Sequence, residues 1–192
     1  MRLINFEMSK FLLLLGASGV GKSTIINELK KLDPRFVYIS PFMTRPLREG
    51  EDEKVSVDKE VFKELEDAGK FVIVNELYGI SYGTPYEPIV DAFDSGNFPV
   101  LDFPISRLDV VKKIFPGQLY VVYVYPPSLE ILRERLKSRP ERMRESEEEI
   151  ERMGESKETF ELSVVNHEGH TKEVAETIYR GYLESLTKES KE

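Results

Sequence analysis

The chain has 192 residues, of which 40% are hydrophobic and 32% are charged, and its formal net charge is -8 at pH 7. This length and balance predict one packed domain and exclude a disordered or fibrous protein. An acidic chain repels a polyphosphate backbone, so nucleic acid is not expected as a partner, and any bound anion needs a local positive site. The chain has no cysteine, which excludes disulfides and thiolate chemistry and fits a cytoplasmic location.

An apolar run near the start of the chain, residues 11–15, looks at first like the core of a signal peptide. It is shorter than the roughly 7 residues of a secretory hydrophobic region and far shorter than the roughly 18 of a membrane span. We therefore expect a buried strand at this position and no membrane partner.

Short apolar, β-branched runs alternate with amphipathic stretches along the rest of the chain. The apolar runs predict strands at residues 10–16, 36–40, 70–75, 98–103, 119–125 and 162–166. The amphipathic patterns predict helices at residues 23–32, 58–68, 106–114, 129–138 and 172–186. Continuous apolar strands are typical of a mainly parallel sheet, so the alternation predicts an α/β layered fold. Residues 137–152 carry almost nothing apolar, which indicates a charged surface helix or a mobile lid.

The first predicted strand runs directly into "GASGVGKST", residues 16–24, which is a complete GxxxxGK[ST] phosphate loop between a strand and a helix. Its glycines let backbone N–H groups turn towards a phosphate, and the helix that follows adds the positive end of its dipole. The pattern predicts that Lys22 reaches the β and γ phosphates of ATP and that the Ser23 hydroxyl binds Mg²⁺. The predicted ATP-binding residues of the loop are Gly16, Ala17, Ser18, Gly19, Val20, Gly21, Lys22, Ser23 and Thr24.

Kinases, GTPases and motors all use a phosphate loop, so the loop alone does not give the reaction. The NKxD motif by which GTPases read guanine is absent, and the chain has no room for a mechanical partner domain. A small phosphotransferase is therefore expected. The run "FPVLD" ends at Asp102, where an apolar strand delivers a carboxylate to the edge at which open α/β sheets bind ligands. Asp102 is interpreted either as a metal or acceptor ligand or as a helix cap.

Several segments, taken in order, resemble the guanylate kinase family over nearly the whole chain. They are residues 16–24, "TRPLREGE" at 44–51, "YGISYGTP" at 78–85, "VLD" at 100–102, "YPPSLEILRERLKSR" at 125–139 and "VVN" at 164–166. The resemblance implies a single P-loop NTPase domain over residues 1–192, with a mainly parallel core sheet, an acceptor-binding insert and a lid. The core is expected at residues 10–40, 98–136 and 154–190, the acceptor-binding region at 41–97 and the lid at 137–153.

The same resemblance implies a kinase that uses ATP with Mg²⁺ and moves the γ-phosphoryl group to the phosphate of a nucleoside monophosphate, with GMP expected. It assigns Arg45 and Arg48 as a clamp on the acceptor phosphate, which suits bidentate guanidinium forks. Further expected acceptor contacts are Ser40, Tyr82, Thr84 and Asp102. The lid arginines Arg135, Arg139 and Arg152 are expected to approach the transferring group, and Asn166 either lies near the adenine of ATP or has a backbone role.

The chain departs from the family at the positions that read guanine. A serine, a glutamate and an aspartate are expected there, and the chain has Pro41, Ile73 and Pro104 instead. An isoleucine cannot accept the N–H donors of guanine, although Ser40 could substitute in part. This pattern resembles the ribose 1,5-bisphosphate phosphokinases, whose acceptor has no base, and a non-catalytic guanylate kinase-like binding module is a third alternative. The acceptor, and the choice between monomer and homodimer, stay open at this point.

Overall fold

The computed structural model of the protein describes residues 10–48, 51, 53–77, 79–103, 105–155 and 160–188. The chain divides into two compact units. The larger unit comprises Met1–Phe36 and Val100–Glu192, and the smaller unit comprises Val37–Pro99. The whole of the predicted acceptor-binding region, residues 41–97, lies within the smaller unit.

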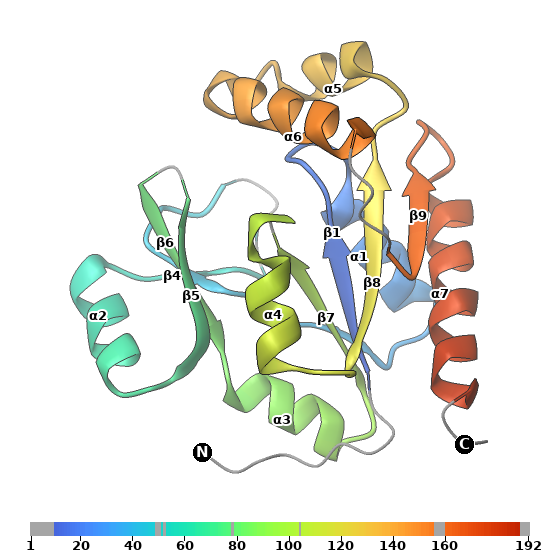
Figure 1. The fold of residues 1–192 in the computed structure, drawn as a ribbon. Coiled ribbons are helices and arrows are strands. Elements are labelled where there is room, and N and C mark those ends of the chain that lie inside the picture. The colour runs from blue at the N-terminus through green and yellow to red at the C-terminus, as the bar shows by residue number, and fades with distance from the viewer. Residues whose placement is uncertain are drawn as a thin grey trace. The chain divides into compact units, whose positions relative to one another are not determined.

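The larger unit is built on a five-stranded sheet in the order β2-β7-β1-β8-β9 (Figure 1). β1 pairs in parallel with β7 and with β8, and β8 pairs in parallel with β9. Every residue of β1 is fully buried, as expected for a central strand that is covered on both faces. The strands are β1 (Phe11–Leu15), β2 (Phe36–Tyr38), β7 (Phe98–Phe103), β8 (Leu119–Tyr125) and β9 (Leu162–Val165).

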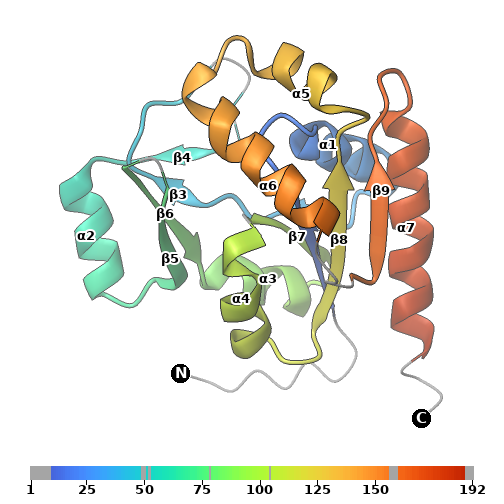
Figure 2. The ribbon, with the colours of Figure 1, turned by 45° about the horizontal axis from the view of Figure 1, so that its top comes forward.

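Helices cover this sheet and form a separate pair at one end of it. α1 and α7 pack against each other, while α4 lies in front of the sheet in Figure 1. α5 and α6 pack together above the strand ends, joined by a short 3₁₀ turn at Pro140–Arg142 (Figure 2). The helices are α1 (Lys22–Leu32), α4 (Leu108–Ile114), α5 (Leu129–Leu136), α6 (Met143–Glu155) and α7 (Thr171–Lys188), and a 3₁₀ turn at Ile105–Arg107 precedes α4.

Local sequence signals account for the positions of several helix ends. The Ser128 hydroxyl, directly after two prolines, accepts a hydrogen bond of 3.3 Å from the Ile131 N–H and so caps the start of α5. α1 carries Lys30 and Lys31 in its last turn, where positive charge favours the helix dipole. Among the helices of the described residues, none combines the length and the apolar character that a bilayer crossing demands.

The smaller unit has a four-stranded sheet in the order β4-β3-β6-β5. β5 and β6 are antiparallel, and α2 packs beside β5 (Figure 1). Three aromatic rings fill the space beside this sheet, with ring centroids 5.5 Å apart for Phe42 and Phe71 and 4.9 Å apart for Phe62 and Phe71. The elements are β3 (Phe42–Met43), β4 (Val55–Ser56), α2 (Lys59–Asp67), β5 (Phe71–Leu77), β6 (Ile80–Pro85) and α3 (Glu87–Asp94).

The predicted α/β fold with a mainly parallel central sheet is confirmed, with one strand corrected. The run at residues 70–75 is a strand, but it belongs to the mixed sheet of the smaller unit, where β5 pairs antiparallel with β6. Along β5, Ile73 and Asn75 are buried while Val74 and Glu76 are exposed, which is the alternation of a strand with one covered face. The strongly charged stretch that was interpreted as a surface helix or a lid contains α6, and α3 was not predicted.

Substitution of Gly83 should destabilise the smaller unit. An ideal Cβ on Gly83 would lie 2.6 Å from the ring of Phe71, which packs against Phe42 and Phe62 and has little room to move. Gly83→Ala should lower the free energy of unfolding by about 1 to 3 kcal/mol, measured by urea denaturation.

The matched control is Gly154→Ala in α6, where an added Cβ meets no described atom within 4 Å beyond its own helix. Alanine there should leave the unfolding free energy unchanged or raise it by about 0.5 to 1 kcal/mol, because alanine favours helix. A Gly83→Ala protein as stable as the wild type would contradict the packing described for Phe71.

Candidate active site

The phosphate loop follows β1 and leads into α1, as the sequence pattern predicts. Gly16, Gly19 and Gly21 all have positive φ angles, of 138°, 87° and 98°. A Cβ on Gly16 would lie 2.5 Å from the carbonyl oxygen of Val124, so only glycine fits between this loop and β8. The Lys22 ammonium group donates hydrogen bonds to the carbonyl oxygens of Gly16 and Ala17, the latter at 3.1 Å. The loop thus closes around its own lysine.

Asn166, at the end of β9, holds the loop from the side. This residue is 3% exposed, and its Nδ2 donates to the carbonyl oxygen of Val20 at 2.9 Å. Its Oδ1 accepts from the Thr171 hydroxyl at 3.1 Å, and a Cβ on Gly21 would collide with the same carboxamide. Asn166 therefore stabilises the loop through a side-chain hydrogen bond to its backbone. That Asn166 lies near the adenine of ATP stays a prediction.

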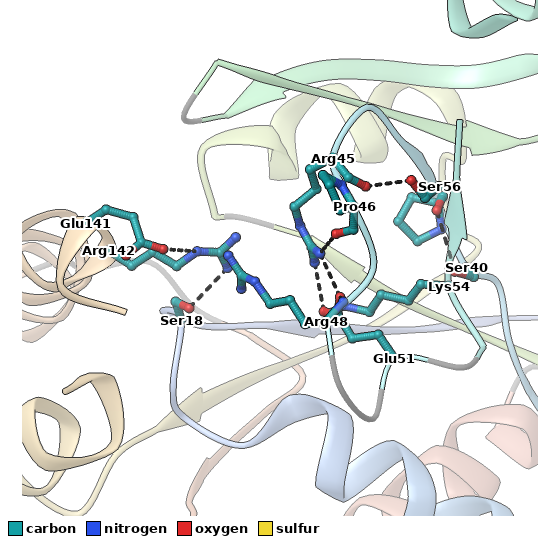
Figure 3. A network of polar contacts seen from close by, with 11 residues as sticks. Ser18, Ser40, Arg45, Pro46, Arg48, Glu51, Lys54, Ser56, Glu141 and Arg142 are labelled. Atoms are coloured by element: carbon teal, nitrogen blue, oxygen red, sulfur yellow. Dashed lines mark hydrogen bonds and ion pairs between the residues drawn. The ribbon is translucent and has the colours of Figure 1, made fainter. Parts of the chain in front are cut away.

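Two arginines of the predicted core and lid reach the phosphate loop. Arg135 donates to the carbonyl oxygens of Asn166 at 3.1 Å and of Gly19 at 3.5 Å. Arg142 Nη1 donates to the Ser18 hydroxyl at 3.3 Å, and its side chain is only 14% exposed (Figure 3). The sequence analysis did not assign Arg142.

The other predicted lid arginines lie at exposed positions. Arg139 is exposed after the end of α5, and Arg152 is exposed on α6. Pro140 is the feature of the sequence that could have pointed to Arg142. A proline opens the 3₁₀ turn Pro140–Arg142, and a short turn changes the direction of the side chains that follow.

A glutamate on α6 fastens this helix to the sheet near the loop lysine. Glu149 accepts a hydrogen bond of 3.0 Å from the hydroxyl of Tyr123 in β8. Burial raises the pKa of the Glu149 carboxyl, while the nearby charge of Lys22 and the hydrogen bond from Tyr123 act in the opposite direction. α6 thus brings one partly buried carboxyl group near the charge of Lys22.

In the smaller unit, Arg45 and Glu51 form a bidentate ion pair (Figure 3). The two N–O distances are 2.6 and 2.7 Å, and the arginine side chain is 9% exposed. Burial alone would raise the pKa of Glu51, but hydrogen bonds from Arg45, from the Arg48 N–H and from Lys54 lower it to about 2. The hydrogen bonds that Arg45 donates to the Glu51 carboxylate raise the pKa of Arg45 in turn. Both groups therefore stay charged.

Arg45 keeps one donor that no described residue uses. Its Nε is buried, and among the residues that the structure describes it has no hydrogen-bond partner. The Arg45 backbone is held in turn, because the Ser56 hydroxyl donates to its carbonyl oxygen at 2.7 Å. A buried N–H of this kind is unfavourable without an acceptor, so the arrangement suits an anionic ligand.

The other predicted acceptor residues fall in both units. Tyr82 and Thr84 lie on β6, with Tyr82 near enough to Arg45 to help raise the pKa of its guanidinium group. The Ser40 hydroxyl lies 3.5 Å from the carbonyl oxygen of Pro41. Asp102 belongs to the larger unit, opposite Leu14 in the pairing of β7 with β1. Of the positions expected to read guanine, Pro41 and Ile73 are described and Pro104 lies outside the described residues.

Oxygen ligands suitable for Mg²⁺ are present in the larger unit. The Ser23 hydroxyl is exposed in the first turn of α1, and Asp102 lies at the same edge of the sheet, on the strand next to β1. Hard oxygen donors of this kind suit Mg²⁺, which keeps several waters and binds substrate phosphates. Within the described ranges no group of three or more His, Asp or Glu side chains is gathered for a metal ion.

The fold and the site define a P-loop nucleotide-binding protein of α/β architecture. The defining features are the parallel sheet, the glycine-rich loop after its central strand, and the lysine that hydrogen-bonds to this loop. The sequence profile described as guanylate kinase matches residues 8–179. The chain therefore belongs to the guanylate kinase family, and the resemblance noted in the sequence is confirmed.

Two relatives and one solved structure agree with this assignment. A guanylate kinase of Carboxydothermus hydrogenoformans is 35% identical over 127 residues, which is 65% of this chain and 62% of that protein. A guanylate kinase of a Nostoc species is 32% identical over 168 residues, or 82% of each chain. A crystal structure of guanylate kinase from Anaplasma phagocytophilum matches with a TM-score of 0.73 at 24% identity, over 93% of this chain and 87% of that one, and supports the fold.

The ion pair of Glu51 should make stability depend on acid pH. Because the pKa of Glu51 is lowered from 4.5 to about 2 on folding, its contribution is complete above about pH 4.5 and is lost as the pH falls towards 2. In the wild type, titration of Glu51 should lower the free energy of unfolding by about 2 kcal/mol between pH 5 and pH 2. This part of the acid loss should be absent in Glu51→Gln, as measured by urea unfolding at several pH values.

Glu64→Gln, at an exposed position on α2, is the matched control and should keep the pH profile of the wild type. If Glu51→Gln and Glu64→Gln gave parallel profiles, Glu51 would not be the titrating group.

Proposed function

We propose that this protein is an ATP-dependent kinase that transfers the γ-phosphoryl group of Mg·ATP to the phosphate of GMP. The observation that carries the proposal is a complete phosphate loop at residues 16–24, closed over Lys22, in a chain that belongs to the guanylate kinase family. The relatives named guanylate kinase, at 35% and 32% identity, point to the same reaction.

On the donor side, the loop backbone and Lys22 hold the phosphates of ATP. The positive φ angles of the glycines leave space for phosphate oxygens near the backbone, and the start of α1 adds a favourable dipole. The Ser23 hydroxyl would hold Mg²⁺, which would neutralise part of the charge of the phosphates. Lys22 then stabilises the charge that moves onto the leaving ADP.

On the acceptor side, Arg45, with Tyr82 near it, would donate to the acceptor phosphate, and Arg48 is the second arginine of the proposed clamp. Glu51 keeps the Arg45 guanidinium in place through two hydrogen bonds. An oxygen of the acceptor phosphate attacks the γ-phosphorus while the bond to the bridging oxygen of ADP breaks. Ser40, Thr84 and Asp102 are the remaining proposed acceptor contacts.

The segment of α5 and α6 supplies positive charge to the transferring group. Arg135 and Arg142 already touch the loop, and Arg139 and Arg152 are proposed to approach it when the lid, residues 137–153, closes. Phosphoryl transfer is catalysed mainly by positioning and charge stabilisation, which arginines provide. Closure also excludes water, so the phosphoryl group goes to the acceptor and not to solvent.

The remaining features of the proposal follow from the same reading. Mg²⁺ accompanies ATP, and the partners are small molecules, with a sugar phosphate as the alternative acceptor. The protein is placed in the cytoplasm, as a monomer or homodimer. The two alternatives, a ribose 1,5-bisphosphate phosphokinase and a non-catalytic binding module, have no support among the relatives reported above and become outcomes of the first experiment.

The first experiment measures ADP release from Mg·ATP with GMP, dGMP, AMP, CMP, UMP and ribose 1,5-bisphosphate as acceptors. We expect GMP to be the preferred acceptor. Activity confined to ribose 1,5-bisphosphate would replace the proposed acceptor, and no binding of Mg·ATP at millimolar concentration would favour the binding module.

Removal of the loop lysine should abolish most turnover with every acceptor. Lys22→Ala should lower kcat by about 100-fold or more, because one preorganised positive group that stabilises the transferring charge is lost. Lys31→Ala is the matched control, since Lys31 is on the same helix, 70% exposed and paired with Glu28. Equal activities of Lys22→Ala and Lys31→Ala would refute the ATP site.

Arg142 should contribute to the rate, although the sequence pattern did not assign it. Arg142→Ala should lower kcat by about 10- to 100-fold, as expected when one guanidinium group is removed from the transferring phosphoryl group. The matched control is Arg144→Ala, because Arg144 is 88% exposed and paired with Glu148 on α6. An Arg142→Ala protein with the kcat of the control would show that the contact with Ser18 has only a structural role.

A further inference from the structure

A polar side chain in the smaller unit is buried without a hydrogen-bond partner. Asn75, in the middle of β5, is 7% exposed, and Thr84 on the neighbouring strand is 4% exposed. Throughout the described part of the chain, no group hydrogen-bonds the carboxamide of Asn75 or the hydroxyl of Thr84. The fully buried side-chain atoms without a partner among the described residues are Arg45 Nε and Ser146 Oγ, so the polar atoms of Asn75 and Thr84 keep a little exposed surface at which a ligand can replace water.

The pairing of β5 with β6 brings these side chains onto one face of the sheet. Ile73 lies opposite Thr84, and Asn75 lies opposite Tyr82. Directly opposed residues of antiparallel strands share a face, and residues two apart on one strand do as well. Asn75 and Thr84 are therefore diagonal neighbours, close enough to contact two edges of one small molecule.

The other face of the same sheet has a different character. Val74 lies opposite Gly83, and the ring of Phe71 lies over Gly83 so closely that a side chain there would collide with it. Phe71 in turn packs against Phe42 and Phe62. The aromatic face thus provides the hydrophobic packing of the sheet, whereas Asn75 and Thr84 lie on the face that carries Tyr82.

The surroundings of Asn75 favour a planar heteroaromatic ring over a sugar. Its neighbour Ile73 is 5% exposed, and Met43, which lies opposite Tyr82 on β3, is fully buried. Apolar side chains around one carboxamide and one hydroxyl suit a ring with polar atoms only on its edge. A phosphorylated sugar presents hydroxyls in all directions and would leave several of them against Ile73 and Met43.

We propose that Asn75 is the residue that reads the acceptor base, with its carboxamide paired to the O6 and N1–H edge of guanine and Thr84 beside it. A carboxamide offers one donor and one acceptor side by side, which matches an edge that presents an acceptor next to a donor. Asn75 thereby replaces the base contact that Ile73 cannot make. The inference rests on the proposed function and names the base-recognition residue of that site.

The test compares three variants of the full chain in steady-state kinetics with GMP and ATP. Asn75→Leu, which keeps the size and removes both polar atoms, should raise the KM for GMP by about 10- to 100-fold. Its KM for ATP should stay within about twofold of the wild type, because the ATP site lies on other residues. Thr84→Val should raise the KM for GMP by a smaller factor, and Val74→Ala, on the aromatic face, should leave both constants unchanged.

Stability separates recognition from a structural role. Asn75→Leu removes a carboxamide that makes no hydrogen bond within the described residues and adds apolar surface at a position that is 7% exposed, so the Tm without ligand should stay the same or rise by about 2 to 4 °C. A rise in the KM for GMP together with unchanged or higher stability supports base reading. A lower Tm with equal losses for GMP and ATP would mean that Asn75 only shapes the unit and would overturn the inference.

Inosine monophosphate provides an independent check, because it shares the O6 and N1–H edge and lacks the 2-amino group. Asn75→Leu should raise the KM for inosine monophosphate by the same factor as that for GMP. If the wild type uses GMP and the variant has the same KM for GMP, only this inference fails. If the wild type does not use GMP at all, the proposed function fails with it.

Discussion

The tight turn between β1 and α1 is the constraint on which the larger unit depends. β1 runs buried between β7 and β8, so Leu15 delivers the loop to the middle of the sheet edge. Gly16 has no space for a side chain because the carbonyl oxygen of Val124 would lie 2.5 Å from its Cβ. Asn166 occupies the space that Gly21 leaves and holds the Val20 carbonyl. The neighbouring strands thus fix the course of the loop, whose Gly16 and Ala17 carbonyl oxygens accept from Lys22.

The smaller unit depends on a different constraint, which is the burial of the Arg45 charge. A buried guanidinium must be paired, and Glu51 pairs it through two short hydrogen bonds. Glu51 also accepts from the Arg48 N–H and from Lys54, so one carboxylate organises the whole segment around the arginine. The Nε of Arg45 stays buried and without a partner among the described residues, so the charge of the guanidinium is balanced while one of its donors is not.

The sequence predicted the parts of the site that are local in the chain. The phosphate loop is contiguous, and its glycines, lysine and hydroxyls have meaning at their spacing alone. The strands of the parallel sheet were found because their apolar runs are continuous. The run at residues 70–75 looked the same, but it lies in the other sheet and pairs antiparallel with β6. An apolar run shows that a strand is buried without showing which strand will pair with it.

The places of Arg142 and Asn75 in the fold could not be obtained in that way. Arg142 lies among many charged residues, and only the fold of α5 and α6 brings its guanidinium to Ser18. Asn75 is one polar residue in an apolar strand, and its significance appears from its pairing with Tyr82 and from the aromatic rings that cover the other face. The sequence by itself therefore determined the fold class and the phosphate loop, because these follow from local spacing and hydrophobic pattern. Only the tertiary structure decided which polar groups are buried and unpaired, because burial and pairing depend on strand register and on contacts between residues far apart in the chain.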